Sequence, residues 1–376
     1  MTNKEIALDN LEACFREAEK AGLTVVKENY RDSAYETYYK TCKTMINDLA
    51  KIHGENNKRL LPAYMNGKLW DDYFERLTVR YEEGTLSADT IEKRVHSLEA
   101  FRTFFNNTNV AGDKTVRIGN KQERLDYLKE RGVIGSQDEV TAMKPSPATV
   151  NAVHSNINTE TDAGKLSLVI NELQVETGSR IRSLVNLQVK DIDFEKCTVR
   201  FQCKNNFTRT VPLTQKATDI LETFCEGKKP GAQVFSLKDR DGNDMSVNKI
   251  VKTVQRYTND AAKASGLNRE NRRYTTHSNR KRYAQNMYNQ TRTMTTQQLK
   301  TAIRNYVNMQ GSNKEGIVER INRELDRINR YRLMNKQHKK GFTREQLRRM
   351  LVSLHLGHSR LDVLSRYVVF DKYPKK

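Results

Sequence analysis

The sequence predicts a mostly α-helical protein with one small antiparallel β-sheet, divided into two domains. Apolar residues recur at helical spacing through most of the 376 residues, and one short segment alternates apolar and polar side chains. Residues 131–147 (RGVIGSQDEVTAMKPSP) contain Gly, Ser and Pro without periodicity, which indicates an interdomain linker. A chain of this length can bury a core in each of two domains.

The first domain, residues 1–130, is predicted to be all-helical, with about four or five helices. Residues 4–21 form the opening helix, and Gly22 ends it. Ser87 is a suitable N-cap for a later helix. The single tryptophan, Trp70, is expected in the core rather than in a site.

The second domain, residues 148–376, begins and ends with predicted helices. Between them, residues 189–213 (VKDIDFEKCTVRFQCKNNFTRTVPL) alternate apolar and polar side chains around two turn-like breaks, at 191–196 and 205–206. This pattern predicts a small antiparallel sheet or hairpin. Helices return from Thr214 onward.

The charge balance indicates a polyanionic partner. The chain carries 66 Lys and Arg against 46 Asp and Glu, a formal net charge of +20, which favours nucleic acid first and an anionic membrane surface second. Residues 291–349 hold 15 basic and 5 acidic residues, half of that excess. A solvated helical hairpin, a phosphate-tracking arm and an oligomer contact all remain open for this segment, whose arginines include Arg320, Arg323, Arg327 and Arg330.

Composition argues against metal, disulfide and membrane chemistry. The five cysteines are scattered without a CxxC pair, and the seven histidines form no metal-ligand pattern, so no metal and no cofactor is expected. The N-terminus lacks a signal-peptide core, and no run of about 18 apolar residues occurs, so a membrane partner is not expected. A reducing cytoplasm suits this cysteine usage.

Four short strings contain residues that suggest one chemistry. They are ETGSRIRSL (176–184), CKNNFTRTVPL (203–213), THSNRKRYA (276–284) and LGHSRLDVLSRY (356–367), and they contribute Arg180, Lys204, His277, Arg280, His358 and Tyr367. Two arginines can bind the oxygens of a phosphodiester, and a phenol can attack phosphorus once its proton is removed. A lysine can protonate the departing alkoxide, and a histidine can act as base. The set predicts metal-free transesterification of a nucleic-acid backbone through a phosphotyrosine.

Each string alone also has an ordinary structural explanation. Arg180 could be a surface residue, Lys204 a turn residue, and the pair His277 and Arg280 a solvated helical pair. A tyrosine at the end of an amphipathic segment is most often part of a core. If residues 360–367 form a helix, His358 and Tyr367 lie about 13 Å apart along its axis, so their convergence requires a bend. The joint occurrence of all four strings in one basic domain favours transesterification over these separate structural explanations.

These strings resemble the motifs of the tyrosine recombinases, the lambda-integrase-like site-specific DNA recombinases. Thr177, Gly178 and Arg180 match TGxR, Lys204 stands eight residues before Pro212 as the hairpin lysine does, and His277 and Arg280 match HxxR. Residues 356–359 match LGHS, and Tyr367 follows His358 by nine positions, as the nucleophile does. Residues 87–105 are less specifically similar to the family's core-binding domain.

The sequence departs from the family pattern at three places. Ser183 stands where an acidic residue usually supports the first arginine, and Lys281 follows Arg280 where histidine is common. Arg280 and His358 are 78 residues apart, far more than the family needs, so residues 291–345 resemble a basic helical insertion. Such an insertion could contact flanking DNA or a neighbouring protomer.

The resemblance implies a helical, SAM-like core-binding domain and an α+β catalytic domain that form a C-shaped clamp on double-stranded DNA. It implies Tyr367 as nucleophile, Arg180, Arg280 and His358 as phosphate ligands, Lys204 as acid and His277 as base. Weaker DNA contacts are expected from Arg209, from Lys281 and from the four arginines of the insertion.

The implied assembly is a homo-tetramer on two specific recombination sites, working through a Holliday junction, with a possible directionality or accessory factor. Integration or excision of a bacterial or phage mobile element, in the cytoplasm at the nucleoid, is the expected setting. A type IB topoisomerase-like nicking-closing enzyme and a DNA-binding accessory protein with a vestigial site are the alternatives.

Overall fold

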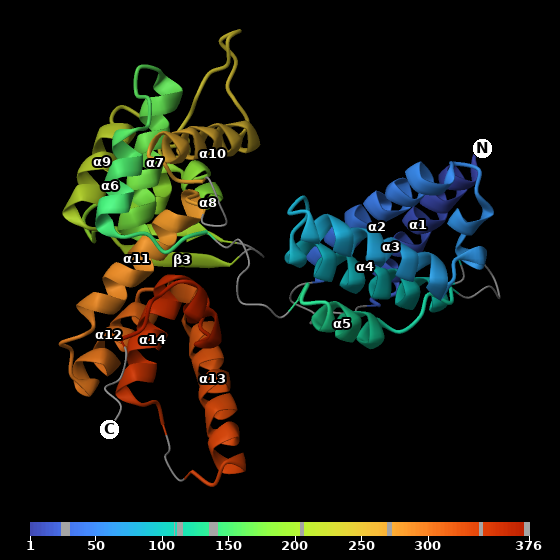
Figure 1. The fold of residues 1–376 in the computed structure, drawn as a ribbon. Coiled ribbons are helices and arrows are strands. Elements are labelled where there is room, and N and C mark those ends of the chain that lie inside the picture. Colours follow the sequence, from blue (N-terminus) through green and yellow to red (C-terminus); the bar gives the residue numbers. More distant parts are fainter. Residues whose placement is uncertain are drawn as a thin grey trace. The chain divides into compact units, whose positions relative to one another are not determined.

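The computed structural model describes residues 1–23, 31–108, 110, 116–134, 142–203, 207–268, 273–337 and 341–371. The chain forms two compact units, the N-terminal unit (residues 1–140) and the C-terminal unit (residues 141–376) (Figure 1). Both are rich in helices, and the described part of the chain contains one three-stranded antiparallel sheet. The predicted fold class is confirmed.

The N-terminal unit is helical throughout its described part. Its helices are α1 (Asn3–Lys20), α2 (Arg31–His53), α3 (Gly67–Glu82), α4 (Ala88–Asn106) and α5 (Lys121–Glu130), with short 3-10 turns at Lys58–Leu60 and Pro62–Tyr64. Thr2 and Glu5 form a capping box at the start of α1, and the Ser87 hydroxyl accepts from the Thr90 amide at the start of α4, as predicted. These caps satisfy amides that would otherwise lack partners.

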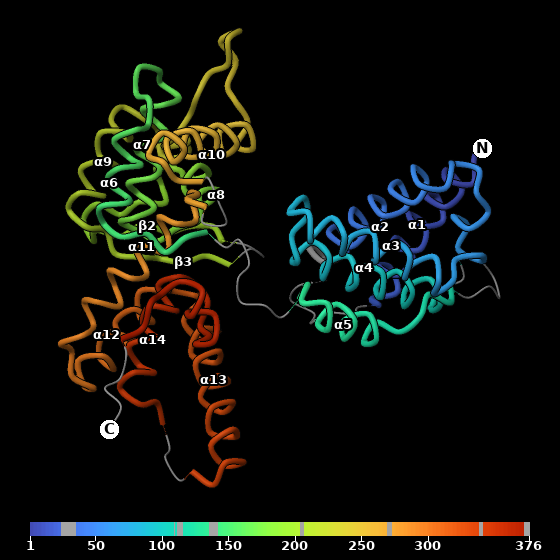
Figure 2. The backbone as a smooth tube through the Cα atoms, in the orientation of Figure 1, coloured from blue at the N-terminus to red at the C-terminus, as the bar shows by residue number. Residues whose placement is uncertain are grey.

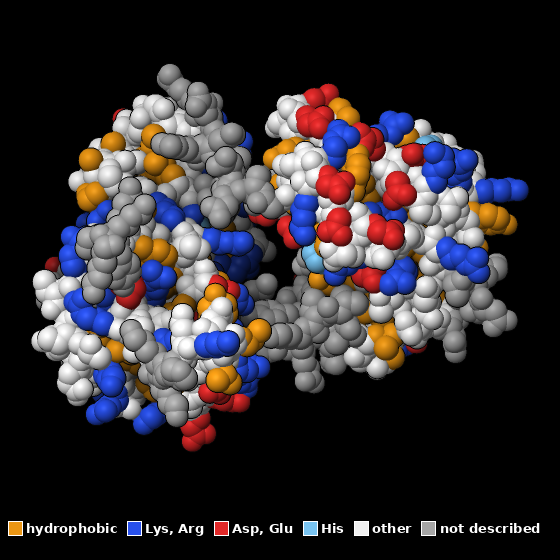
Figure 3. Space-filling view, turned by 60° about the horizontal axis from the view of Figure 1, so that its bottom comes forward, with side chains coloured by type: hydrophobic (Ala, Val, Ile, Leu, Met, Phe, Trp, Pro, Cys, Tyr) orange, Lys and Arg blue, Asp and Glu red, His pale blue; other side chains and the backbone are white. Residues whose placement is uncertain are grey.

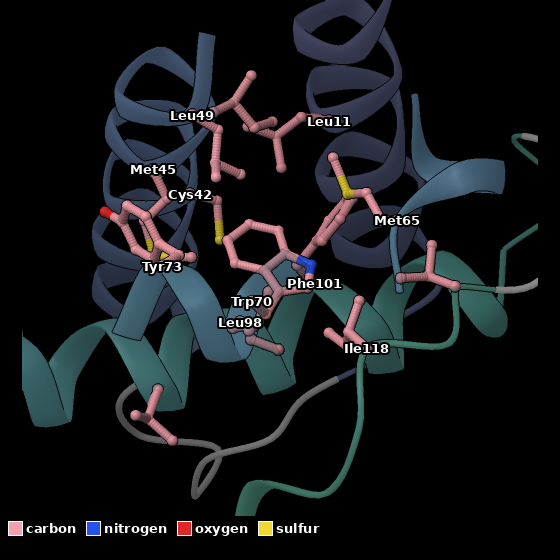
Figure 4. Packing of buried hydrophobic residues seen from close by; sticks show 14 of the residues in the cluster. Leu11, Cys42, Met45, Leu49, Met65, Trp70, Tyr73, Leu98, Phe101 and Ile118 are labelled. Atoms are coloured by element: carbon pink, nitrogen blue, oxygen red, sulfur yellow. The ribbon is translucent and has the colours of Figure 1, made fainter. Parts of the chain in front are cut away.

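The core of the N-terminal unit surrounds Trp70, which is 1% exposed. Side chains from α1, α2 and α4 pack around its indole, among them Leu11, Cys42 and Phe101 (Figure 4). The expectation that Trp70 belongs to the core is therefore confirmed.

The C-terminal unit contains the sheet and the remaining helices. The sheet has the order β1 (Ile192–Asp193), β2 (Thr198–Gln202), β3 (Thr208–Pro212), with Val199 opposite Val211 and Phe201 opposite Arg209. The helices are α6 (Pro147–Ser155), α7 (Asp162–Thr177), α8 (Ile181–Val185), α9 (Gln215–Cys225), α10 (Val247–Ala264), α11 (Thr276–Gln290), α12 (Thr296–Asn308), α13 (Lys314–Met334) and α14 (Arg344–His355). Short 3-10 turns occur at Val189–Asp191, Gly311–Asn313 and Asp362–Arg366.

A buried polar network fixes α11 against α7 and α10. The Asn279 amide donates to Asn171 Oδ1 at 2.5 Å, and the Asn171 amide donates to the Thr258 hydroxyl at 2.9 Å. All three residues are fully buried. Because unpaired polar groups in a core are costly, this network holds the three helices in one relative position.

The predicted insertion forms α12, α13 and the start of α14 (Figure 2). Ile317, Ile321 and Ile328 of α13 pack against the main core of the C-terminal unit. Gln310 exchanges hydrogen bonds with the backbone of Thr210 in β3 at 3.0 and 2.8 Å, and the Asn313 amide donates to the Thr208 carbonyl at 3.0 Å. The segment is thus built into the C-terminal unit along one edge of the sheet.

A helix that crosses a bilayer must be both long and apolar. No helix of the described residues combines the two properties.

Candidate active site

The structure brings five of the six predicted residues together. Arg180 caps the N-terminus of α8, His277 and Arg280 lie on α11, His358 follows α14, and Tyr367 follows the 3-10 turn Asp362–Arg366. The Tyr367 ring lies 5.3 Å from the rings of both histidines, measured between centroids. Lys204 lies outside the described residues.

Arg280 is the central buried cation of the site. It is 1% exposed, and its two terminal nitrogens donate to the carbonyls of Gly178 and Leu356. These two carbonyls belong to the TGxR and LGHS strings, so one guanidinium joins both motifs to α11. Its Nε has no hydrogen-bond partner among the described residues, and its guanidinium carbon lies 5.8 Å from the centre of the Tyr367 ring.

The hydrogen bonds around His358 suit an unprotonated Nε2. This nitrogen lies 3.1 Å from the Tyr367 hydroxyl and 3.4 Å from Arg280 Nη2. A guanidinium can only donate, so a ring that accepts at Nε2 fits the Arg280 contact, and the Tyr367 hydroxyl can donate to the same nitrogen. A neutral His358 is therefore in a position to accept the hydroxyl proton of Tyr367.

The surroundings of both histidines keep the imidazoles uncharged. Burial lowers the pKa of His358 to about 3, and the charges of Arg280 and Arg180 act in the same direction. Burial lowers the pKa of His277 to about 4, again with help from Arg280. Burial also lowers the pKa of Arg280, to about 9, which leaves the guanidinium a cation at neutral pH. Neutral imidazoles beside fixed cations can accept a proton, which an imidazolium cannot do.

Three arginines surround the site without carboxylate partners. Among the described residues, no Asp or Glu forms an ion pair with Arg180, Arg209 or Arg280, although many other arginines there are paired. Buried guanidinium groups normally have anionic partners, because an unpaired buried charge is strongly destabilising. The missing negative charge is what a bound phosphate would supply.

Arg209 occupies an unexpected place for a residue predicted to contact DNA weakly. It lies on β3, on the same face as the buried Val211, and is 1% exposed with Nε and Nη1 unpartnered among the described residues. Its guanidinium carbon lies 5.7 Å from the centre of the Phe201 ring. A Cβ on Gly357 would lie 3.4 Å from Arg209 Cδ, so the arginine supports the turn that precedes His358.

The chain between His358 and Tyr367 does not form the helix considered above. Gly357 and Ser359 have φ values of 73° and 58°, and these left-handed residues turn the chain after α14. Only the short 3-10 turn Asp362–Arg366 follows, so the side chains meet at 3.1 Å instead of lying a helix length apart. The bend that brings His358 and Tyr367 together is therefore formed at Gly357 and Ser359.

Two contacts of the tyrosine-bearing segment were missed from the sequence. Glu324 of α13 is 4% exposed, and its Oε1 accepts from the Leu361 amide at 3.0 Å. Lys144 Nζ donates to the carbonyls of Ser365 and Val368. Neither residue belongs to a motif, although Glu324 falls at helical spacing from Ile317, Ile321 and Ile328, which is a weak signal of an inward-facing carboxylate.

The remaining predicted residues lie outside the central site. Lys281 is 3% exposed and donates to the Ala142 carbonyl, and the Ser183 hydroxyl donates to the Gln202 carbonyl at 2.8 Å. In the insertion, Arg323 pairs with Glu319, Arg327 pairs with Glu324, Arg320 lies over the Phe207 ring, and Arg330 is exposed. Lys and Arg side chains gather on the displayed face of the C-terminal unit (Figure 3). The weaker DNA contacts stay predictions.

Gly178 is the most constrained backbone position of the site. It ends α7 with φ 59°, and a Cβ there would overlap the ring of Tyr283. Gly178→Ala should therefore destabilise the protein by about 2–4 kcal/mol, through left-handed strain and overpacking together. Thermal unfolding measures this against Gly227→Ala, whose site has φ 69° and no atom within 4 Å of the added Cβ. Equal losses for the two variants would contradict the account.

Part of the chain is similar to known proteins in sequence. Residues 147–299 match the model of the phage integrase family. Tyrosine recombinase XerC of Roseiflexus sp. (strain RS-1) is 28% identical over 152 residues, which make up 39% of this chain and 43% of that protein. The match thus spans less than half of the length of this curated relative.

The fold resembles that of a solved DNA-bound recombinase. XerH site-specific recombinase, bound to palindromic difH substrate in a post-cleavage complex, aligns with a TM-score of 0.50 at 14% identity, covering 90% of this chain and 76% of that one. The Tn1549 transposon integrase in complex with transposon right end DNA aligns with a TM-score of 0.49 at 15% identity, covering 77% and 87%.

Proposed function

Because residues 147–299 match the model of the phage integrase family, we propose that this chain is a site-specific DNA recombinase that cuts and rejoins strands through a 3′-phosphotyrosine. One observation carries the proposal: the Tyr367 hydroxyl lies 3.1 Å from Nε2 of His358, beside arginines that have no carboxylate partner among the described residues. A nucleophile, a proton acceptor and cations suited to a phosphate thereby lie together.

The reaction follows from the positions of these groups. Tyr367 Oη forms a bond to the scissile phosphorus while the bond from phosphorus to the 5′-oxygen breaks. The strand then carries a 3′-phosphotyrosyl end and a free 5′-hydroxyl end. Arg180 and Arg280 bind the non-bridging oxygens and stabilise the charge of the five-coordinate transition state. Lys204 supplies the proton to the departing 5′-oxygen, as the resemblance implies.

The proton of Tyr367 has two candidate acceptors. The resemblance assigned this role to His277, whose ring packs edge-on against the Tyr367 ring. His358 Nε2 lies at hydrogen-bond distance from the hydroxyl, and no such bond joins His277 to it among the described residues. General bases act at hydrogen-bond distance from the proton that they remove, which favours His358 for the first step. His277 remains as the second candidate once DNA is bound.

Strand joining reverses the same step. The 5′-hydroxyl of a partner strand attacks the phosphotyrosine, and Tyr367 leaves as phenol, so the phosphodiester bond energy is conserved without ATP. A homo-tetramer on two specific double-stranded DNA sites and passage through a Holliday junction are proposed from the family. Mobile-element integration or excision is the proposed setting, with residues 1–130 as the core-binding domain and the basic side chains of the insertion as further DNA contacts.

Trapping on nicked DNA tests the proposal. A duplex carrying a nick one nucleotide beyond the scissile phosphate, built from the ends of the element, should accumulate a covalent protein–DNA adduct, because the short 5′-terminal fragment diffuses away. Denaturing gels report the adduct. Absence of an adduct on every such substrate, with binding intact, would favour the accessory protein with a vestigial site.

A second assay separates the recombinase from the topoisomerase alternative. Supercoiled DNA without a recombination site should be relaxed poorly by the monomer, because the recombinase requires two bound sites. Efficient relaxation of such DNA by monomeric protein would favour a type IB topoisomerase-like activity with the same adduct.

A further inference from the structure

We propose that Lys144 is a positioning residue for the nucleophile: its ammonium group binds the backbone on both sides of Tyr367 and keeps the phenol in the active site of its own chain. The inference rests on the proposed function of Tyr367 and adds a residue that no motif contains. The contacts that carry it are hydrogen bonds to main-chain atoms, which do not depend on the side chains of residues 365 and 368.

The hydrogen bonds of Lys144 converge on the tyrosine segment. Lys144 Nζ lies 2.5 Å from the Ser365 carbonyl oxygen and 3.0 Å from the Val368 carbonyl oxygen. These carbonyls stand two residues before and one residue after Tyr367. One ammonium group therefore fixes the backbone immediately before and after the nucleophile.

A lysine suits this place for two physical reasons. The segment Asp362–Arg366 is a short 3-10 helix, and the last carbonyls of a helix lack intrahelical partners. An ammonium group offers three donors and a positive charge, which is favourable beside carbonyls at a helix C-terminus. The Lys144 residue as a whole is exposed, but partial burial of its ammonium group lowers the pKa, which agrees with a group that has given up part of its hydration for these carbonyls.

Lys144 is itself attached to the helix that carries HxxR. The preceding residue, Met143, donates its amide to the Arg273 carbonyl at 2.9 Å, and Ala142 forms a parallel bridge with Arg273. Lys281 of α11 donates to the Ala142 carbonyl. Since Lys281 follows Arg280 directly, residues 142–144 connect the backbone beside Tyr367 to the same helix that presents Arg280 and His277.

Other contacts hold the segment, but none of them flanks the nucleophile on both sides. The Gln285 side chain bonds the backbone of Val369 at 2.7 and 3.3 Å, and Asp371 pairs with Arg292 and Arg348 at 2.5 and 3.2 Å. Glu324 binds the Leu361 amide, six residues before Tyr367. These bonds anchor the ends of the segment, and Lys144 holds its centre.

Removal of the ammonium group should therefore slow chemistry without weakening DNA binding. Lys144→Met keeps the length of the side chain and removes the donors. Hydrogen bonds to charged groups contribute more than neutral ones, so we expect adduct formation to slow about tenfold at saturating protein. Lys144→Arg retains a cationic donor and should recover most of the rate. Lys196→Met is the matched control, because Lys196 is exposed and pairs with Asp193 alone among the described residues.

The experiment measures four quantities on wild type and the three variants. They are the dissociation constant for nicked site DNA, the single-turnover rate of adduct formation, the thermal midpoint, and hydrogen exchange of residues 361–371 without DNA. The proposal expects a slower rate and faster exchange in Lys144→Met, with affinity and thermal midpoint unchanged. An unchanged rate and exchange would overturn it, and so would a loss of affinity at unchanged rate, which would make Lys144 a DNA contact only.

The exchange measurement separates the failure of this inference from the failure of the proposed function. If wild type forms no adduct, the proposed function fails, while exchange still reports whether Lys144 holds the segment. If wild type forms the adduct and Lys144→Met equals it in rate and exchange, only the inference about Lys144 fails. A lowered thermal midpoint with a proportional loss of active protein would assign Lys144 a purely structural role and would also overturn it.

Discussion

Tyr367→Phe should bind site DNA as wild type does and form no covalent adduct. The phenylalanine keeps the ring that packs against His277 and lies over Arg280, and it removes only the oxygen that would attack phosphorus. Among the described residues, no other hydroxyl lies at hydrogen-bond distance from His358 Nε2, so the expected loss is complete rather than partial. Denaturing gels of the nicked substrate measure the adduct, and fluorescence anisotropy measures affinity.

The control for this variant is Tyr331→Phe. Tyr331 is 67% exposed near the C-terminal end of α13, so the loss of its hydroxyl should leave adduct formation unchanged. An adduct formed by Tyr367→Phe at the wild-type rate would show that another residue is the nucleophile, and it would refute the roles assigned around His358.

Arg280→Met should lower the rate of adduct formation by about 10²–10³-fold, because the variant loses a preorganised donor to the charge of the transition state. It should also lower the thermal midpoint. The carbonyls of Gly178 and Leu356 lose their buried donor, and each unsatisfied group costs about 1–3 kcal/mol. Removal of an unpaired buried charge offsets part of that cost.

The rate must be expressed per folded molecule to separate the two effects of Arg280→Met. Arg200→Met is the matched control, since Arg200 is exposed on β2 and pairs with Asp191 at 3.2 Å. It should leave both the rate and the affinity near wild type. If folded Arg280→Met forms the adduct at the wild-type rate, Arg280 only joins the two motifs and does not act on phosphate.

Much of the fold followed from local patterns. Helix starts at Thr2, Ser87 and Thr214 obey capping chemistry, in which a side-chain oxygen accepts from an amide of the first turn. The strand alternation around residues 198–212 gave the hairpin, because one face of that sheet is buried. These features depend on neighbours in sequence, which is why a single sequence displays them.

The sequence predicted the site residues that belong to motifs. It did not predict the features of the site that depend on tertiary contacts. The approach of Arg180, His277, Arg280, His358 and Tyr367 was expected from three of the four strings. The acceptor state of His358 Nε2 depends on Arg280 donating across 78 residues, and no pattern displays such a contact. The burial of Arg209 could be predicted in part, because strand alternation places this residue on the same face as the buried Val211.

The structure of the insertion could also be predicted only in part. Its helical spacing and charge were evident, yet its hydrogen bonds to β3 come from Gln310 and Asn313, which no hydrophobic pattern distinguishes. Glu324 of α13 accepts a hydrogen bond from the Leu361 amide, so the insertion is bonded to the segment that carries Tyr367. The inner side of the insertion is therefore part of the C-terminal unit. Its outer end, with Leu333 and Met334 at 77% and 83% exposed, carries no assigned partner.

The central claim is that Tyr367 becomes covalently attached to the 3′-phosphate of a cleaved strand. Mass spectrometry of the protease-digested adduct, trapped on nicked site DNA and trimmed with nuclease, identifies both the residue and the polarity. The account predicts one modified peptide containing Tyr367, linked to the 3′-phosphate, with a free 5′-hydroxyl on the released fragment. Attachment at another residue, or a 5′-phosphotyrosyl linkage, would contradict it.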